Sequence, residues 1–588
     1  MAYIFDLETD GLYHQATKIH TIAIYDLDKK KMYSFNKHEV IKGIKMLHKQ
    51  VVIGHNIVKF DLPVIQKFYP WFTWKKAIDT LILATFAYPD IGRTIDDNLI
   101  EKKKLPRALR GKYSLEAFGY RLGELKGTFA KTTDWQEWSP AMQKYCIQDV
   151  KVTLKLWQKL STKAYSKQAV DLEHKVAWII GRLERYGWYF DVKAAWELEA
   201  ELRQEFNETL KKLREVFPPK KIITGFYTRP NKTRGIKPGD PKIKIQEFNP
   251  GSSKQIIARL REKYGKIPIS YTKKGNETIA DEDLKSMGIP EADLLLEYKQ
   301  LKKWLGMLAD GDAAWLKVYD SKTNRIYYSI LTNGAVTGRM RHISPNIAQV
   351  PKMDRFRRLF TVPEDKILVG VDASGLEFRC FANRVGDPDY IKVVLEKDIH
   401  TENQKLAGLE TRSQAKTFIY AFLYGGGDEK LGRITHPDET SKTKLITYGK
   451  QLREKFLQNI PGLNKLYNLA SEQAERYGYV QGLDGRKIIV DATYKAVNRL
   501  LQSDGAIVMK KALVILDTNL QKAGLKPGKD YEFVGIIHDE FQIETKPEYA
   551  NQIGTMASEA IREAARRFNF VCPLDGDMKI GRTWAETH

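Results

Sequence analysis

The sequence has few cysteines and no long hydrophobic run. Its only cysteines are Cys146, Cys380 and Cys572, which form neither a C-x-x-C pair nor a zinc-ligand spacing. An odd, scattered set argues against structural disulfides and structural zinc and favours a reducing compartment. No run of about 18 apolar residues is present, so we predict no membrane span. The first residues carry no charged leader, so we predict no targeting segment.

The charge balance is strongly basic. Lys and Arg number 96 against 73 Asp and Glu, which gives a net charge of +23 and a pI near 9.4. A basic chain of enzyme size usually binds a polyanion such as nucleic acid, although the charge could simply keep the protein soluble. Because one hydrophobic core stops growing at about 250–300 residues, a chain of 588 residues predicts two or more domains.

Acidic residues near the N-terminus occupy positions that a fold could bring together. Asp6 and Glu8 lie two apart in a strand pattern, so both side chains leave the same face. Asp61 follows a second short strand, and Tyr145 and Asp149 lie four apart on one face of a predicted helix. These oxygen ligands suit two divalent cations that activate a water and cleave a phosphodiester. Taken singly, each acid is more simply explained as a surface residue.

A second acidic set follows two strand patterns far downstream. The apolar run 367–371 ends in Asp372, and the run 533–537 ends in His538, Asp539 and Glu540 before another apolar run. This second pattern predicts a hairpin with acids at its tip. If the strands are neighbours in one sheet, Asp372 and Asp539 form a second two-metal site.

Between these strands lies a helix with a polar stripe. Arg412, Lys416, Tyr420 and Tyr424 are spaced by four, so they drift slowly around one face of a helix. Cations near the helix start suit phosphates, and tyrosines suit sugar and base, so the stripe fits a nucleoside triphosphate. The alternative is an amphipathic helix with packed tyrosines and exposed cations.

The segment from Pro218 to Ile245 is rich in lysine, arginine, proline and glycine. It carries eight basic residues against one acidic residue. We expect an exposed basic loop or flap, either a solvated linker or a contact for nucleic acid. Beyond it, Ser252 and Ser253 offer hydroxyl caps for a basic helix that starts near Lys254.

Three motifs in the N-terminal region resemble those of a nuclease family. They are Phe5-Asp6-Leu7-Glu8-Thr9, Asn56-(three residues)-Phe60-Asp61 and Tyr145-(three residues)-Asp149. They resemble the exonuclease motifs of the DEDDy proofreading nucleases, which have a ribonuclease-H-like fold. The resemblance implies that the four acids Asp6, Glu8, Asp61 and Asp149 bind metals and that Tyr145 positions the attacking water.

Downstream motifs resemble family A DNA polymerases, the Klenow-like right-hand enzymes. The matching runs are Asn333–Arg339, Asp372–Glu377, Ala415–Tyr420, Leu483–Arg486 and Gly581–Trp584. They are more similar to the replicative polymerases of the T-seven-like bacteriophages than to the bacterial repair enzyme. The resemblance implies an α/β and α+β multidomain fold, with a ribonuclease-H-like DEDDy exonuclease and a right-hand polymerase of palm, fingers and thumb.

The resemblance also implies domain boundaries and residue roles. The expected ranges are 1–165 for the exonuclease, 166–330 for the thumb with a short basic insertion near 218–247, 331–385 and 501–588 for the palm, and 386–500 for the fingers. Asp372 and Asp539 hold the catalytic metals, with Glu540 beside them. Contacts to the incoming triphosphate come from Arg412, Lys416 and His400. Glu377 and Tyr424 check the sugar, and Tyr420 stands where a tyrosine tolerates a missing 3′-hydroxyl.

Contacts to DNA are implied for a further group of residues. Positions that touch primer or template are Arg339, Asn346, Gln349, Arg357, Asn498, Gln502 and His538. We add Ser252, Ser253 and Lys254, at the start of the basic helix, as candidate DNA contacts.

The expected function is DNA-templated DNA synthesis with 3′–5′ proofreading, as the replicative enzyme of a bacteriophage in the host cytoplasm. The primer 3′-oxygen attacks the α-phosphate of a dNTP, and pyrophosphate leaves. We expect Mg²⁺ as cofactor, two ions per site, with Mn²⁺ as a substitute. The expected partners are primer–template DNA, dNTPs, a helicase–primase and a single-stranded-DNA-binding protein, and the protein is expected to be a monomer. The phage relative binds host thioredoxin through a much longer insertion near 218–247, so thioredoxin dependence is doubtful here.

Two other functions remain open on the sequence. A single-subunit RNA polymerase shares the palm and the helix stripe, but Glu377 and the exonuclease acids argue against it. A non-catalytic DNA-binding or processivity module would need none of the acids at strand ends. Mg²⁺-dependent primer extension with dNTPs against NTPs discriminates among all three.

Overall fold

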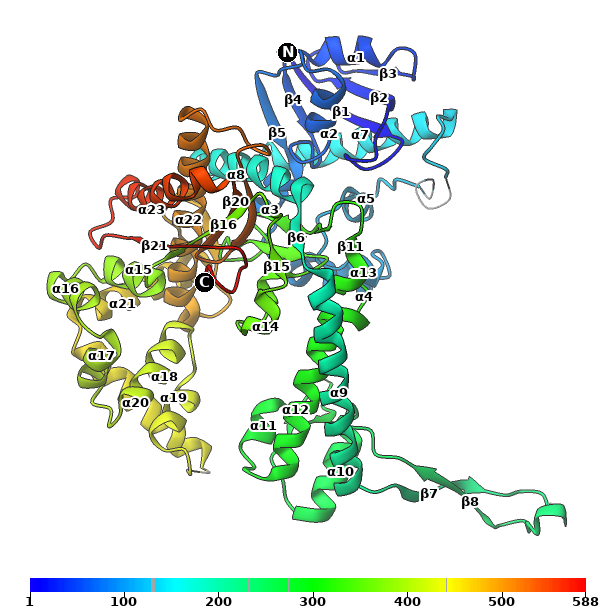
Figure 1. Cartoon of the computed structure of the whole chain (residues 1–588), viewed down its shortest axis with the longest axis vertical. Coiled ribbons are helices and arrows are strands. Elements are labelled where there is room, and N and C mark those ends of the chain that lie inside the picture. The colour runs from blue at the N-terminus through cyan, green and yellow to red at the C-terminus, as the bar shows by residue number, and fades with distance from the viewer. Residues whose placement is uncertain (128, 130–132, 231, 273, 440) are drawn as a thin grey trace. The chain divides into compact units, whose positions relative to one another are not determined.

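The computed structural model describes residues 1–127, 129, 133–230, 232–272, 274–439 and 441–588 (Figure 1). These residues form two compact units, Met1–Tyr189 with Tyr327–His588 and, separately, Phe190–Ile326. Among them, no helix is long and apolar enough to cross a membrane. All three cysteines are buried and free, as their spacing predicts.

A five-stranded sheet, here called the N-terminal sheet, forms the core of the first 161 residues. Its strands are β1 (Ala2–Thr9), β2 (Ile19–Asp26), β3 (Lys31–Phe35), β4 (Val51–Gly54) and β5 (Lys76–Asp79). Their order is β3-β2-β1-β4-β5, with β1 antiparallel to β2 and parallel to β4. The apolar run Tyr3–Phe5 is buried in β1, which explains why this segment forms a central strand.

Helices pack around the N-terminal sheet. They are α1 (Val40–Leu47), α2 (Asp61–Phe68), α3 (Thr80–Ala87), α4 (Asp97–Glu101), α5 (Leu115–Leu122) and α7 (Pro140–Leu160). The Ser139 side chain accepts a hydrogen bond from Met142 N and Pro140 follows it, so α7 begins with a favourable cap. Helix α7 packs on β1 and β2 (Figure 1), which places its Tyr145–Asp149 turn next to the strand that carries Asp6.

A four-stranded antiparallel sheet, here called the C-terminal sheet, joins segments far apart in sequence. Its strands are β16 (Ile367–Ala373), β19 (Tyr531–Ile537), β20 (Glu540–Thr545) and β21 (Gly576–Gly581), in the order β19-β20-β16-β21. His538 adopts a left-handed φ of 56° in the tight turn between β19 and β20. The strands that contain the apolar runs before Asp372 and Asp539 lie in one sheet, as predicted, but they are not neighbours, because β20 lies between β16 and β19.

Long helices support the C-terminal sheet. They are α8 (Lys167–Tyr186), α22 (Ala496–Lys522) and α23 (Ala550–Arg567). Helix α23 packs on β16 and β21, and α8 packs on α22 and β19. Helix α8 ends just before Gly187, which takes a φ of 70°, and β6 (Trp188–Phe190) follows.

A helical region lies between β16 and α22 in sequence. Its helices are α15 (Leu376–Val385), α16 (Pro388–Glu396), α17 (Ile399–Ala407), α18 (Arg412–Leu423), α19 (Asp428–Thr435), α20 (Lys442–Gln458) and α21 (Pro461–Tyr477), followed by the hairpin β17 (Tyr479–Gln481) and β18 (Lys487–Ile489). Phe418, Ile419 and Phe422 are buried in its core, and Tyr420 packs partly against it, whereas Arg412 and Lys416 are exposed. Short elements precede β16: β13 (Ser329–Leu331), β14 (Arg341–Ile343), α14 (Asp354–Arg357) and β15 (Phe360–Thr361).

The unit Phe190–Ile326 has its own helical core. Its helices are α9 (Val192–Val216), α10 (Ser253–Tyr264), α11 (Asp281–Lys285), α12 (Pro290–Leu305) and α13 (Trp315–Val318), and α9 packs on α12. Its short strands are β9 (Ser270–Tyr271), β10 (Glu277–Thr278), β11 (Tyr319–Asp320) and β12 (Arg325–Ile326).

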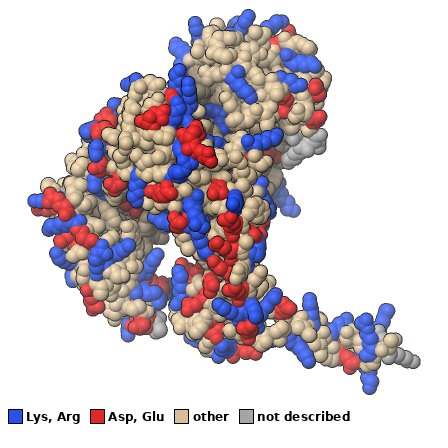
Figure 2. Space-filling view, in the orientation of Figure 1, with Lys and Arg blue, Asp and Glu red and all other residues tan. Residues whose placement is uncertain are grey.

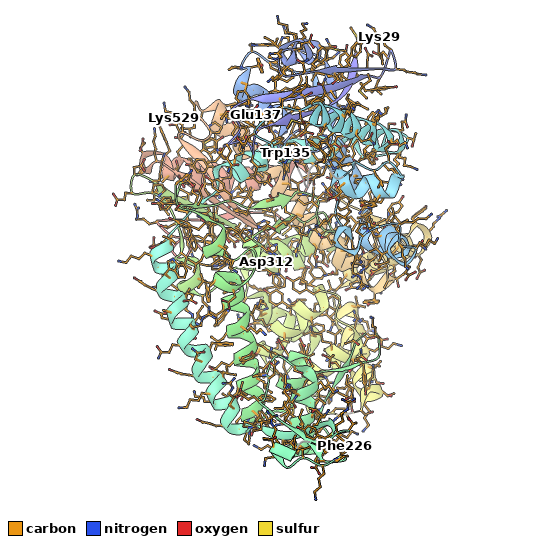
Figure 3. The ribbon with its side chains drawn as sticks, turned by 90° about the vertical axis from the view of Figure 1, so that its right-hand side faces the viewer. Lys29, Trp135, Glu137, Phe226, Asp312 and Lys529 are labelled. Atoms are coloured by element: carbon orange, nitrogen blue, oxygen red, sulfur yellow. The ribbon has the colours of Figure 1, made fainter. Side chains whose placement is uncertain are left out.

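The basic segment near 218–247 is a hairpin, where the sequence predicted a loop. Strand β7 (Lys220–Phe226) pairs antiparallel with β8 (Pro241–Gln246). The hairpin projects from the end of α9 (Figure 1), carries Lys and Arg (Figure 2) and exposes Phe226 (Figure 3). Neither face of the hairpin is covered by other elements. Its strands therefore lack the alternation of apolar and polar residues by which a strand is recognised in a sequence.

Candidate active sites

The first site is the N-terminal acidic cluster of Asp6, Glu8, Asp61 and Asp149. Ligand atoms of Asp6, Glu8 and Cys146 lie within 4.8 Å of one another. Asp61 is the first residue of α2, and Asp149 lies on α7 one turn after Tyr145. The fold therefore brings together the acids that the sequence predicted.

Burial and mutual repulsion disfavour the charged forms of these acids. Desolvation, followed by repulsion from Asp149, raises the pKa of Asp6 and of Glu8 well above the usual range. Burial raises the pKa of Asp61 to about 7. Burial also raises the pKa of Asp149, to about 6, although the cation of Lys126 opposes that rise. A divalent cation would relieve the repulsion.

Lys126 also belongs to the N-terminal acidic cluster, although no sequence motif indicates it. Its Nζ lies 2.5 Å from Asp149 Oδ2 and 4.9 Å from the centre of the Tyr145 ring. No motif spacing links residue 126 to residues 145 and 149, because the contact spans a loop. Because buried charges are usually paired, a buried Asp149 predicts a neighbouring cation, but the sequence does not indicate which lysine or arginine supplies it.

The donor set of the N-terminal acidic cluster fits a hard divalent cation. Asp149 Oδ1 is buried and has no hydrogen-bond partner among the described residues. Cys146 Sγ donates to Asp6 O at 3.3 Å, and burial raises the pKa of this thiol, so it stays protonated. The remaining ligands are carboxylate oxygens, which Mg²⁺ and Mn²⁺ prefer.

The second site is the C-terminal acidic cluster of Asp372, Asp539 and Glu540. Asp372 on β16 lies opposite Glu540 on β20, and Ala373 N donates to Asp539 O at 2.9 Å. Burial, followed by repulsion from Asp539 and Glu540, raises the pKa of Asp372 to about 7. The backbone pairing holds these acids side by side at the edge of the sheet.

Glu540 differs from its two neighbours because protein groups already bind its carboxylate. Trp584 Nε1 and Gln542 Nε2 donate to Oε1 at 2.6 and 2.5 Å, and His588 Nδ1 lies 3.1 Å from Oε2. Burial would raise the pKa of Glu540, but these partners lower it. Glu540 is thus fixed and ionised by protein groups, whereas Asp372 and Asp539 are the candidate ligands for a cation.

The predicted triphosphate contacts lie on and around α18. Arg412 pairs with Asp398, with Nη2 2.6 Å from Oδ2, and Lys416 is exposed one turn later. The Tyr420 and Tyr424 rings stack with centroids 6.2 Å apart. The His400 ring lies 5.9 Å from the Tyr420 ring, so His400 is close to the stripe.

Glu377 links the stripe to the loop before β14. The Tyr424 hydroxyl lies 2.8 and 2.6 Å from the two Glu377 oxygens, and Arg339 Nη2 lies 3.0 Å from Oε1. These three side chains line a cavity of about 480 Å³ together with Tyr420 and Asp539. The predicted sugar-checking pair therefore lies in one cavity with an acid of the C-terminal acidic cluster.

The other predicted DNA contacts have varied surroundings. Asn346 precedes the short helical turn Ile347–Gln349, while His538 lines the cavity. Arg357 is buried with its guanidinium 4.4 Å from the Trp584 ring. Asn498 donates to Leu423 O and accepts from Gln502 at 3.3 Å. Ser252, Ser253 and Lys254 start α10, where Ser252 accepts from Gln255 N, and they belong to the separate unit Phe190–Ile326.

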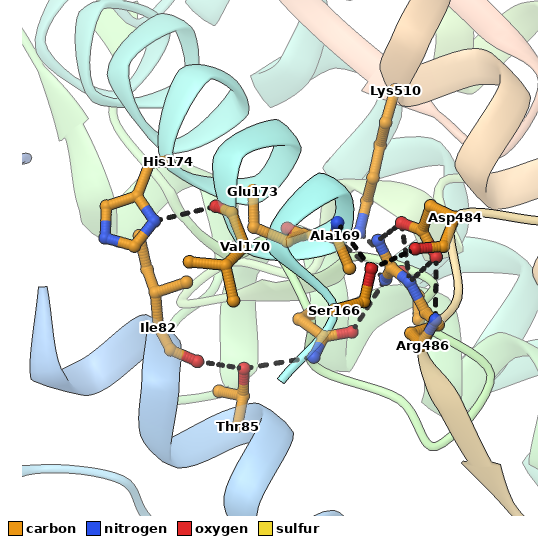
Figure 4. Close-up of polar contacts among 12 residues, drawn as sticks. Ile82, Thr85, Ser166, Ala169, Val170, Glu173, His174, Asp484, Arg486 and Lys510 are labelled. Carbon is orange, nitrogen blue, oxygen red and sulfur yellow. Dashed lines mark hydrogen bonds and ion pairs between the residues drawn. The ribbon is translucent and has the colours of Figure 1, made fainter. Parts of the chain in front are cut away.

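A buried ion network underlies the loop that carries Arg339. Arg486 Nη1 lies 3.0 Å from Glu173 Oε1, and its Nη2 lies 2.6 Å from Asp484 Oδ2. Lys510 pairs with Glu173 (Figure 4) and donates to Gly338 O at 2.6 Å. Burial would raise the pKa of Glu173, but Lys510 and Arg486 lower it, so this carboxylate stays ionised. The network ties α8 and α22 to the residue before Arg339.

We expect Glu173→Gln to destabilise the protein by about 3–5 kcal/mol, because it leaves two buried cations with one partner fewer. Chemical denaturation would show a clearly lower midpoint. Glu137→Gln is the control, since Glu137 pairs with Lys18 and both side chains are exposed, and its midpoint should not move. An unchanged midpoint for Glu173→Gln would contradict a structural role for the network.

Comparisons with known proteins agree with this architecture. The family model for DNA polymerase family A matches residues 240–586, and that for the RNase_H superfamily matches residues 3–161. The DNA-directed DNA polymerases of Enterobacteria phage T3 and Escherichia phage T7 are 32% and 33% identical, over 100% of this chain and 100% of each relative. The alignments span 712 positions, so both relatives contain segments that this chain of 588 residues lacks.

A solved structure supports the fold. The POL domain of Pol1 from M. smegmatis, in complex with DNA primer-template and dNTP, aligns with a TM-score of 0.73 and 18% identity. The alignment covers 99% of this chain and 95% of that one. At this identity the likeness concerns the fold alone.

The antiparallel sheet with paired aspartates, the helix stripe and the RNase H-like domain together define a polymerase with an attached nuclease-like domain. The chain belongs to DNA polymerase family A, and it is similar over its whole length to the enzymes of the T7-like phages. The predicted fold class and enzyme class are confirmed.

Proposed function

We propose that this protein copies DNA from a primer–template and removes misincorporated nucleotides with its own 3′–5′ exonuclease. The observation that carries the proposal is the presence of two acidic clusters on two separate sheets. Each cluster is built on a strand whose apolar residues are buried, so its carboxylates are held rigidly. A phage replicative role is supported by the similarity to the T3 and T7 enzymes.

We propose that Mg²⁺, or Mn²⁺, binds at both clusters. Asp372 and Asp539 would hold it at the C-terminal site, and Asp6, Glu8, Asp61 and Asp149 would hold it at the N-terminal site. Paired divalent ions, when bound, activate the attacking oxygen and stabilise the leaving oxygen of a phosphoryl transfer.

The residues around the C-terminal acidic cluster bind and orient the substrates of synthesis. Lys416 and Arg412 offer cations to the triphosphate, once Arg412 exchanges Asp398 for phosphate. Glu377, held by Tyr424 and Arg339, crowds the sugar and excludes a 2′-hydroxyl. The primer–template and dNTP that the M. smegmatis neighbour binds are the substrates proposed here.

The right-hand subdomains can be proposed for this fold. The unit Phe190–Ile326 and the preceding α8 fall within the range 166–330 proposed as the thumb. Residues 331–385 and 501–588, which contain the C-terminal sheet, form the palm, and 386–500, which contain α18, form the fingers. Residues 1–165 form the exonuclease.

Primer extension tests this function. The full-length protein with Mg²⁺ should extend a primer with dNTPs at least about 10³-fold more efficiently than with NTPs, since a crowded sugar site rejects the larger group. Equal or better use of NTPs would favour a single-subunit RNA polymerase. No extension with either would favour a non-catalytic DNA-binding module.

We expect Mg²⁺ to bind at least about tenfold more weakly for each pH unit below the ligand pKa values, because each acid must lose a proton to bind metal. Those values are about 7 for Asp61 and Asp372 and about 6 for Asp149, so binding should weaken strongly between pH 8 and pH 6. Thermal unfolding at increasing Mg²⁺ concentration measures the change.

The sign of the stability change follows from the same pKa values. In the unfolded chain an aspartate loses its proton near pH 3.9, whereas these aspartates hold theirs to about pH 6–7 in the fold. Without metal, the free energy of unfolding therefore falls as the pH rises from about 4 to about 7, and bound Mg²⁺ restores it. Equal Mg²⁺ stabilisation at pH 6 and pH 8 would contradict metal binding by these acids.

A further inference from the structure

Lys126 lies inside the N-terminal acidic cluster and has no role in the function proposed so far. Its ammonium is 2.5 Å from Asp149 Oδ2, and its side chain is 15% exposed. The same ammonium lies 4.9 Å from the centre of the Tyr145 ring. One buried cation thus contacts two residues on the same face of α7, and both are proposed to act in excision.

The segment that carries Lys126 is fixed on helix α7. Gln148 Nε2 donates to Glu124 Oε1 at 2.7 Å and to Leu125 O at 3.0 Å. Lys155 Nζ lies 2.6 Å from Glu124 Oε2. These contacts come from the turns of α7 on either side of Asp149, so the position of Lys126 is set by the fold and needs no bound DNA.

The two carboxylate oxygens of Asp149 have different surroundings. Lys126 binds Oδ2, whereas Oδ1 is buried and lacks a hydrogen-bond partner among the residues that the structure describes. A buried carboxylate oxygen without a partner is costly unless a cation binds it. Since Asp6 and Glu8 are acidic neighbours of Asp149, the Oδ1 atom of Asp149 belongs to the proposed metal site.

Tyr145 is held between Lys126 and an aromatic group. The Phe129 and Trp135 rings lie 5.4 and 6.3 Å from the Tyr145 ring, and Trp135 lies near the N-terminal sheet in Figure 3. An ammonium over a ring that is also packed by aromatic neighbours restricts the ring to one orientation. The direction of the Tyr145 hydroxyl therefore depends on Lys126.

We propose that Lys126 is a positioning residue of the exonuclease site, which orients Asp149 and Tyr145 and leaves Asp149 Oδ1 for the divalent cation. This inference rests on the exonuclease function proposed above. An ammonium is a donor without a lone pair, so Lys126 is not itself a metal ligand. Its effect on excision passes through Asp149 and Tyr145.

Matched variants of the full-length protein test the proposal on a single-stranded oligonucleotide. Lys126→Met should lower the excision rate at saturating DNA and Mg²⁺ by about 10–100-fold, the usual effect of losing a group that orients a ligand. Lys126→Arg keeps the charge and should recover most of the rate. Lys159→Met is the control, because it removes an exposed charge from the same helix and should leave the rate unchanged.

Binding of Mn²⁺ separates positioning from loss of the folded site. It is measured by electron paramagnetic resonance in protein that also carries Asp372→Ala and Asp539→Ala, so that only the N-terminal acidic cluster is observed. Lys126→Met should bind Mn²⁺ within about tenfold of the parent, because the loss of a repelling cation offsets the higher pKa that Asp149 then has. Complete loss of Mn²⁺ binding would mean that the site has collapsed, and it would overturn the proposal.

A double variant tests whether Lys126 acts through the Tyr145 hydroxyl. Tyr145→Phe with Lys126→Met should excise little more slowly than the slower single variant, since groups that act as a unit are not additive. Fully additive losses would contradict this. If Lys126→Met raises only the KM for DNA, then Lys126 acts as a contact for a DNA phosphate, and the proposal is wrong.

The same assay distinguishes this proposal from the function on which it rests. Parent protein that fails to excise with Mg²⁺ contradicts the exonuclease itself. Parent protein that excises, beside a Lys126→Met variant of equal rate, contradicts only the role of Lys126.

Discussion

Asp539→Ala should lower the rate of DNA synthesis by about 10³-fold or more and leave excision intact. The substitution removes one of the two carboxylates proposed to hold metal at the C-terminal acidic cluster. A loss of about 4 kcal/mol of transition-state stabilisation corresponds to about a thousandfold in rate. Single-turnover primer extension measures synthesis, and degradation of a single-stranded oligonucleotide measures excision.

The Asp539→Ala protein should remain folded. Asp539 repels Asp372, so its removal relieves strain in the metal-free protein and should not lower the unfolding midpoint. Asp575→Ala is a matched control, because Asp575 pairs with Arg562 at a half-exposed position and is not assigned to catalysis. Synthesis at the parent rate by a folded Asp539→Ala protein would exclude Asp539 from the active site.

Asp6→Ala should have the opposite effect, with excision lowered by about 10³-fold or more and synthesis unchanged. Asp6 lies on β1 of the N-terminal sheet, where burial and three acidic neighbours raise its pKa. Its carboxyl group is therefore stable there only when it is protonated or binds a cation. The C-terminal sheet shares no strand with the N-terminal sheet, so its geometry should be unaffected. The two assays used for Asp539→Ala measure this outcome as well.

Asp28→Ala serves as the control for Asp6→Ala. Asp28 lies just beyond β2, outside the N-terminal acidic cluster, and its loss should change neither activity. Loss of both activities in a folded Asp6→Ala protein would contradict the separation of the two sites.

The parts of the fold that the sequence predicted follow strong local patterns. The apolar runs before Asp372 and Asp539 form buried strands, because continuous apolar segments of this length pack on both faces of a covered sheet. The spacing by four in Arg412, Lys416 and Tyr420 predicted one helix face, and α18 has that face. The motif resemblance supplied the family, which the comparisons confirm.

Other parts depend on contacts that no local pattern encodes. Glu173 meets Arg486 and Lys510 across 313 and 337 residues, so their pairing depends on the tertiary fold. The hairpin β7–β8 exposes both faces and was predicted as a loop. Lys126 reaches Asp149 from a segment that Gln148 and Lys155 hold on α7 through Glu124.

The central claim is that two separate acidic clusters perform opposite reactions on one DNA end, and idle turnover tests it most directly. On a primer–template with only the next dNTP, the parent protein should convert dNTP into dNMP continuously by repeated addition and excision. Neither Asp539→Ala nor Asp6→Ala alone should do so, whereas an equimolar mixture should restore turnover, because the DNA end can pass from one molecule to the other. Continued conversion of the added, labelled dNTP into dNMP by either variant alone, or a silent mixture of two variants that each keep one activity, would contradict the account.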